Sequence, residues 1–165
     1  MSETIGSNII NQNLPVILDS IDKYYAFSDK ILSNKEKRID IIEVEDSVTY
    51  DQFVLEECNL CFNEVKKDGT NLDRKNFTEF KIKDLSAHKI DRYNLELIKP
   101  KKGFYDRKTI EIGFSNFYIN RKGDQCFFTV EKRPANSKGT TVEIYFFEKV
   151  NGNWKFKTRH KLMNG

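Results

Sequence analysis

The sequence contains few of the residues and motifs that mark an enzyme or a metalloprotein. Among 165 residues there are two His, three Cys and one Trp. An odd number of Cys argues against a disulfide framework and fits a reducing compartment. His88 and His160 are isolated, without a Ser, Cys or carboxylate spaced to suggest a catalytic triad. Because Gly-rich phosphate-binding motifs are also absent, we expect no cofactor and no enzymatic activity.

Long apolar runs and a strong charge imbalance are missing as well. No stretch approaches the roughly 20 apolar residues that span a bilayer, so we expect no membrane span. Net charge is +3, from 28 basic and 25 acidic residues, which gives no general case for binding nucleic acid. The first ten residues have neither a basic n-region nor an apolar h-region. We therefore expect a cytoplasmic protein, with the cell envelope as the alternative if a signal sequence was removed.

Aromatic-rich runs separated by short polar turns fill the last fifty residues. They cover residues 113–119, 125–132, 140–150 and 153–161. The Asn151-Gly152 pair between the last two runs is typical of a type I′ hairpin, since that turn needs positive φ at both central residues. These runs predict an antiparallel meander of three to four strands.

A two-residue turn also fixes the register of this hairpin. It places Val150 opposite Asn153 and Glu148 opposite Lys155. Further along, the predicted pairs are Phe147 with Phe156 and Phe146 with Lys157. One face then carries Tyr145, Phe147, Trp154 and Phe156, and we expect that face to be the core side, with Trp154 as its largest buried side chain.

The first half of the chain has helical patterns. Ile17, Ile21, Tyr24 and Tyr25 are spaced as on a helix, which we place at about residues 15–25 with Pro15 in its first turn. A capping box at 49–52 begins a second helix, a short helix falls within 71–80, and strands are predicted at 38–45, 93–98 and 109–112. The fold class predicted is α+β, with N-terminal helices packed on an antiparallel sheet. Residues 1–13 are expected to be a mobile end and 14–165 a single domain.

Cys58 and Cys61 form a C-x-x-C motif for which three interpretations are open. A zinc site needs two further ligands, and no second closely spaced pair is present. A redox motif belongs at a helix N-terminus, whereas this one falls in the middle of the second predicted helix beside Glu56 and Glu57. Both sulfurs lie on the apolar stripe of that helix, so we favour a structural role in the core, and keep the pair as weak metal candidates.

Two charged clusters can each be interpreted as an ordinary solvated surface or as a functional site. Strand alternation places Lys155, Lys157, Arg159 and Lys161 on the face opposite Trp154, where they are either an interaction surface or a solvated face that protects an edge strand. The acidic residues Asp40, Glu43, Glu45 and Asp46 surround one predicted strand. They lack the loop spacing of a calcium-binding EF-hand.

The C-terminal half resembles a known group of proteins. The motifs that carry the resemblance are the segment IGFSNFYINRKGD at 112–124 and the segment FEKVNGNWKF at 147–156. They are similar to a family of small uncharacterised bacterial proteins with an FS-x-x-x-F/I-N-x-x-G strand pair and a closing EK-x-NG-x-W hairpin. Members often carry a lipoprotein signal. Many also have a Cys- and Gly-containing stretch, and residues 133–139 stand in its place in this chain. A weaker resemblance is to NTF2-like or cystatin-like α+β folds, and neither resemblance implies an activity.

Two functions from different classes follow. The first is a non-enzymatic bacterial binding or accessory protein whose partner is another protein, in one form an immunity-type protein that neutralises a toxin. The second is a small-molecule-binding or enzymatic NTF2-like domain with a cavity between helix and sheet. A closed aromatic core would favour the first, and an exposed polar cluster at the open mouth of the sheet the second. Nucleic-acid binding ranks third.

Overall fold

The computed structural model describes residues 2–18, 41–46, 77–78, 82, 85, 88–90, 93–99, 109–114, 117–119, 122–134 and 141–164. These residues form one helix and eight strands. The elements in chain order are α1 (Ser2–Ile17), β1 (Ile41–Glu45), β2 (Phe77–Thr78), β3 (Asn94–Ile98), β4 (Thr109–Phe114), β5 (Phe117–Ile119), β6 (Gln125–Pro134), β7 (Thr141–Val150) and β8 (Asn153–Asn164).

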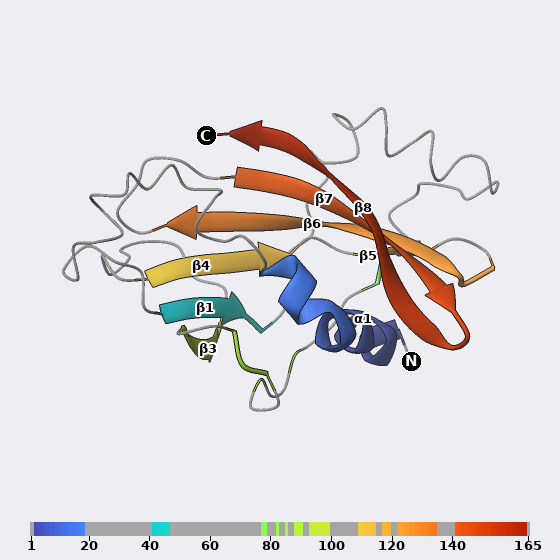
Figure 1. Ribbon diagram of the computed structural model, residues 1–165, viewed down its shortest axis with the longest axis horizontal. Coiled ribbons are helices and arrows are strands. Elements are labelled where there is room, and N and C mark those ends of the chain that lie inside the picture. Colours follow the sequence, from blue (N-terminus) through green and yellow to red (C-terminus); the bar gives the residue numbers. More distant parts are fainter. Residues whose placement is uncertain are drawn as a thin grey trace.

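All eight strands belong to one mixed sheet, with α1 lying across it (Figure 1). Strands β5, β6, β7 and β8 follow one another as antiparallel neighbours, so the predicted meander is confirmed. Strand β6 has β7 on one side and, on the other, first β5 and then β4. Strand β1 lies between β3 and β4 and is parallel to both.

The predicted fold class is wrong. Instead of several N-terminal helices on an antiparallel sheet, the described part of the chain is dominated by the sheet, with a single helix and two parallel strand pairs. Residues 77–78, predicted as helix, form β2 and pair with β5. The helix predicted from residue 49 lies outside the described residues, as do residues 19–25 of the first predicted helix. Parallel pairing joins distant segments through crossovers, which local patterns do not reveal.

The one described helix begins much earlier than predicted. Residues 2–13, expected to be a mobile end, form most of α1, and Pro15 lies inside the helix rather than at its start. One stripe of α1 and the residue after it is buried at helical spacing, which explains why this segment is helical. Its members are Ile9, Ile10, Leu14, Ile17 and Leu18.

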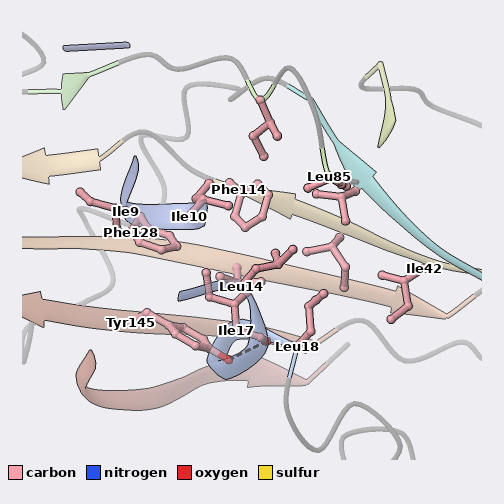
Figure 2. Packing of buried hydrophobic residues seen from close by; sticks show 14 of the residues in the cluster. Ile9, Ile10, Leu14, Ile17, Leu18, Ile42, Leu85, Phe114, Phe128 and Tyr145 are labelled. Carbon is pink, nitrogen blue, oxygen red and sulfur yellow. Dashed lines mark hydrogen bonds between the residues drawn. The ribbon is translucent and has the colours of Figure 1, made fainter. Parts of the chain in front are cut away.

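This stripe packs on one face of the sheet, which we call the inner face, and the opposite face is the outer face. The inner face carries the stacked rings of Phe128 and Phe147, whose centroids are 5.2 Å apart, and the ring of Tyr145. Figure 2 shows Phe128 and Tyr145 against the side chains of α1. Trp154 is 6% exposed and belongs to the same cluster, so its predicted burial is confirmed.

The β7–β8 hairpin has the predicted register only near its turn. Asn151 and Gly152 have φ of 52° and 82°, and the pairs from Val150–Asn153 to Phe147–Phe156 are confirmed. Phe146 then pairs with Thr158, so the predicted pairing of Phe146 with Lys157 is wrong. An extra residue at this bulge reverses which face the following side chains of β8 occupy as far as Lys161, after which the register shifts a second time between Glu143 and Val142.

Helix α1 also contacts the side of β8 that faces away from β7, at Trp154. The backbone N–H of Trp154 donates to Gln12 Oε1 at 2.9 Å, and Asn13 Nδ2 donates to the Trp154 carbonyl at 3.2 Å. Two polar helix side chains thus satisfy outward-facing backbone groups at the start of this edge strand. Among the residues that the structure describes, no helix is long and apolar enough to cross a membrane.

Candidate functional site

The four cations predicted as an interaction surface lie on β8, but they do not share a face. Lys155, Lys157 and Lys161 are exposed, and Arg159 is partly buried. Before the bulge, Lys155 is paired with Glu148 on the outer face. After it, Arg159 is opposite Tyr145, which places Arg159 and then Lys161 on the inner face. The alternation predicted for this strand is therefore wrong beyond Phe156.

Exposed apolar side chains mark the same hairpin. Among the described residues, the large hydrophobic side chains that are exposed are Val150, at 41%, and Phe156, at 37%. The Phe156 ring is held on one side by the rings of Tyr145 and Phe147, each with its centroid 6.0 Å away. A partly exposed ring fixed in this way is suited to contact a partner without losing much side-chain freedom.

We define the hairpin surface as Lys149, Val150, Lys155, Phe156, Lys157 and Lys161, all of which are exposed. Lys149 Nζ lies 5.9 Å from the centroid of the Trp154 ring, next to the turn of the hairpin. The exposed cations of the hairpin surface therefore extend to its turn. A surface with apolar contacts among cations is complementary to an apolar patch bordered by carboxylates.

A second cluster of charges lies on the outer face, with Glu45 and Glu111 buried and Arg133 and Glu131 partly exposed. Arg133 Nη2 lies 2.5 Å from both Glu45 Oε1 and Glu111 Oε1, and Arg133 Nη1 lies 3.2 Å from Glu131 Oε2. The sheet brings these residues together, because Glu111 of β4 pairs with Arg133 of β6 and β1 runs parallel beside β4. Gly113 leaves the space that the Glu45 carboxylate occupies.

This arrangement changes the proton affinity of Glu45. Burial, with a smaller contribution from the hydrogen bond to Glu111, raises the pKa of Glu45 to about 7, and the charge of Arg133 opposes the rise. Near neutral pH the Glu45 carboxyl group therefore changes between its protonated and its charged form. Such a group suits either general acid–base chemistry or a structural ion cluster.

A third cluster ties α1 to the inner face. Lys132 is fully buried, with Nζ 3.2 Å from Glu143 Oε1 and donating to the Tyr145 hydroxyl at 3.1 Å. That hydroxyl donates to the carbonyl of Ile17, the last residue of α1, at 3.3 Å. The last turn of α1 has no basic residue of its own, and Lys132 is linked to its C-terminus through the Tyr145 hydroxyl. Arg159 also approaches Glu143, at 3.9 Å.

Sequence reasoning noted Glu43 and Glu45 but missed Glu111, Arg133 and Lys132. The usable signal was a charged residue inside an apolar strand run, as in the Ile-Glu-Ile of β4. Of the predicted acidic patch, Asp40 lies outside the described residues. Within the described part of the chain, no group of three or more His, Cys, Asp or Glu is placed to hold a metal ion.

The structure does not test the cysteine predictions. Cys58 and Cys61 lie outside the described residues, so their role stays a prediction. Cys126 is buried beside the aromatic residues of the inner face, and burial raises the pKa of its thiol. It therefore behaves as a small apolar side chain.

Comparison with known proteins gives no relative from which a role can be transferred. No protein-family profile, no curated protein and no solved structure matches this chain.

Proposed function

We propose that this chain is a non-enzymatic bacterial binding protein that uses the hairpin surface to hold an acidic surface of another protein. In its specific form it is an immunity-type protein and the partner is a toxin. One observation carries the proposal: the two exposed large hydrophobic side chains of the described residues share one hairpin with four exposed lysines. Exposed apolar side chains beside cations, here on both faces of one hairpin, are typical of a protein-binding surface.

The packing between α1 and the sheet supports this function over the cavity-based alternative. Apart from Asn13 and the Lys132–Glu143 pair below the end of α1, the described side chains there are aliphatic and aromatic, and Ile9, Leu14, Phe128, Tyr145 and Phe147 are at most 1% exposed. The rings of Phe128, Tyr145 and Phe147 stack on one another, and Figure 2 shows Phe128 and Tyr145 beside the side chains of α1. A closed aromatic core of this kind favours a protein whose function lies on its surface.

The buried carboxyl pair favours a second candidate, an enzymatic or small-molecule-binding domain. Its supporting observation is the pKa of Glu45, which at about 7 fits a general acid or base at neutral pH. We rank this candidate second because Arg133 bridges both carboxylates and compensates their charge, as in a structural ion cluster.

Co-purification from the native cells tests the proposed function. The double variant Lys155→Glu/Lys161→Glu reverses two cations of the hairpin surface. Its matched control, Lys89→Glu/Lys99→Glu, reverses two other exposed lysines and changes the net charge equally. We expect one acidic partner to bind the wild type and the control and to be lost from the hairpin variant. Equal recovery of the same partner with all three proteins would overturn the proposal.

If the partner is a toxin, co-expression gives a functional readout of the same surface. The wild type and the control variant should restore growth of cells that make the toxin, and the hairpin variant should not. Protection by the hairpin variant equal to that by the wild type would contradict an immunity role for this surface.

A further inference from the structure

We propose that Asn151 is a site of spontaneous covalent modification, at which loss of the side-chain amide converts it to aspartate or isoaspartate and adds a negative charge to the hairpin surface. The modification site itself depends only on the geometry of the β7–β8 turn. Its consequence, weaker binding of an acidic partner as the protein ages, rests on the proposed function and names a way in which that binding is regulated.

The turn between β7 and β8 leaves the reacting groups open to solvent. The strand pairing ends at Val150 and Asn153, so Asn151 and Gly152 are the two central residues of the turn. Both residues are exposed. A Cβ added at Gly152 would meet no atom within 4 Å. The side-chain amide of Asn151 is therefore followed by a backbone nitrogen that no side chain crowds and that water can reach.

The backbone nitrogen of Gly152 is the nucleophile of the reaction. It forms a bond to Cγ of Asn151 and closes a succinimide ring, while the Cγ–Nδ2 bond breaks and the amide leaves as ammonia with the proton of that nitrogen. The reaction is favoured because both groups are already held next to each other. Glycine also has no Cβ to oppose the backbone rotation that brings its nitrogen to Cγ.

Water completes the reaction by opening the succinimide ring at one of its two carbonyl carbons. Addition at Cγ breaks the new Cγ–N bond and gives aspartate. Addition at the backbone carbonyl carbon of residue 151 breaks the original peptide bond and gives isoaspartate, in which the main chain runs through Cγ. Water is the only co-reactant, and no group is oxidised or reduced.

The conformation of the turn fits one product and excludes the other. Asn151 and Gly152 have φ of 52° and 82°. Aspartate tolerates positive φ as asparagine does, so this product keeps the type I′ turn. Isoaspartate inserts an extra methylene group into the main chain of a two-residue loop. We expect this insertion to disturb the register that pairs Lys149 with Trp154.

Either product places a carboxylate beside the cations of the hairpin surface. Residues 149–157 contain three Lys and no Asp or Glu. A carboxylate at residue 151 lowers the positive potential of this segment and repels the carboxylates of an acidic partner. The turn is therefore placed so that its slow chemistry weakens the surface that we propose holds the partner.

Peptide mapping tests the modification site without any partner. The full-length protein is incubated at mildly alkaline pH, and trypsin then releases residues 150–155 by cleaving after the flanking lysines. The synthetic peptide VNGNWK, incubated in parallel, shows how fast the same residues react outside the fold. The control protein is Asn151→Gly, because glycine keeps the positive φ of the turn and removes the amide. Asn153, which Trp154 follows, is the internal comparison within the same peptide.

We expect residues 150–155 of the wild type to gain the mass that results when a carboxyl group replaces an amide. Fragmentation should place the change at Asn151, and Asn153 should stay intact. The fraction with isoaspartate should show red-shifted Trp154 fluorescence, whereas the fraction with aspartate should keep the native spectrum. An intact Asn151 in the folded protein, after the free peptide VNGNWK has been fully converted, would overturn the site.

Binding to poly-L-glutamate, as a stand-in for the acidic partner, tests the regulation separately. At low salt Asn151→Asp should bind this polymer about two- to fivefold more weakly than Asn151→Gly, the effect of one exposed charge. Equal binding of the two variants would overturn the regulation and leave the modification site standing. Failure of the wild type to bind the polymer at low salt would also overturn the regulation, and co-purification would then decide the proposed function independently.

Discussion

The Glu45 carboxylate occupies the space left by the missing side chain of Gly113. A Cβ added at Gly113 would lie 3.1 Å from Glu45 Oε2, closer than an ordinary contact. Residue 113 follows directly after the register pair Val44–Ile112 of the parallel strands β1 and β4, so it is the neighbour of Glu45 across the sheet. Arg133 holds the same carboxylate from β6 and restricts how far it can move.

Gly113→Ala should therefore destabilise the protein, by about 1–3 kcal/mol, the usual range for overpacking a buried site. Urea denaturation measures the change. In a Glu45→Ala background the added methyl group has space. Gly113→Ala should then lower the free energy of unfolding by only a few tenths of a kcal/mol, which is about the margin within which independent substitutions add. An equal cost in both backgrounds would show that Glu45 is not what the methyl group meets.

The free energy of unfolding should depend on the proton of Glu45. Its folded pKa of about 7 is above the ordinary value of 4.5, so between these values the folded state binds the proton more tightly than the unfolded chain. This contribution to stability is fully present below pH 4.5 and is lost as pH rises through 7, with a slope of at most about 1.4 kcal/mol per pH unit. Glu45→Gln should flatten the profile. Parallel profiles for the two proteins would contradict the assignment.

Lys132→Met should destabilise the fold by about 3–5 kcal/mol, because it leaves the buried Glu143 carboxylate without its nearest cation. Lys132→Met/Glu143→Met removes both charges and should recover most of the loss. Thermal denaturation of the three proteins measures the effect. A double variant no more stable than Lys132→Met would mean that the pair itself is not the cause.

Trp154 should report the native packing directly. At 6% exposure its fluorescence should be blue-shifted and poorly quenched by iodide in the folded protein. Trp154→Ala should cost about 3–5 kcal/mol, as for other large aromatic core deletions. A red-shifted, readily quenched signal from the folded protein would contradict the burial of this ring.

The sequence predicted those parts of the fold that local chemistry determines. Asn151 and Gly152 determined the hairpin turn, and the register from Val150 to Phe147 followed from it. The bulge after Phe156 could not be predicted, because an extra residue in β8 changes no local turn signal. For the same reason the faces of Arg159 and Lys161 were assigned wrongly.

Other differences between the predicted and the observed fold arose from tertiary contacts. Ile9, Ile10 and Leu14 are a helical stripe, but Pro15 was taken to mark the first turn when it lies near the end of α1. The cluster of Glu45, Glu111 and Arg133 depends on three strands far apart in the sequence. The only sign of this cluster in the local sequence was a charged residue within an apolar run.

The central claim, that the hairpin surface holds an acidic protein partner, is tested most directly by calorimetric titration of the purified partner. Wild-type affinity should fall as salt rises, and Lys155→Glu/Lys161→Glu should weaken binding by about 30-fold or more at low salt. Lys89→Glu/Lys99→Glu should bind as the wild type does. Equal affinities for all three proteins, unchanged by salt, would contradict the account.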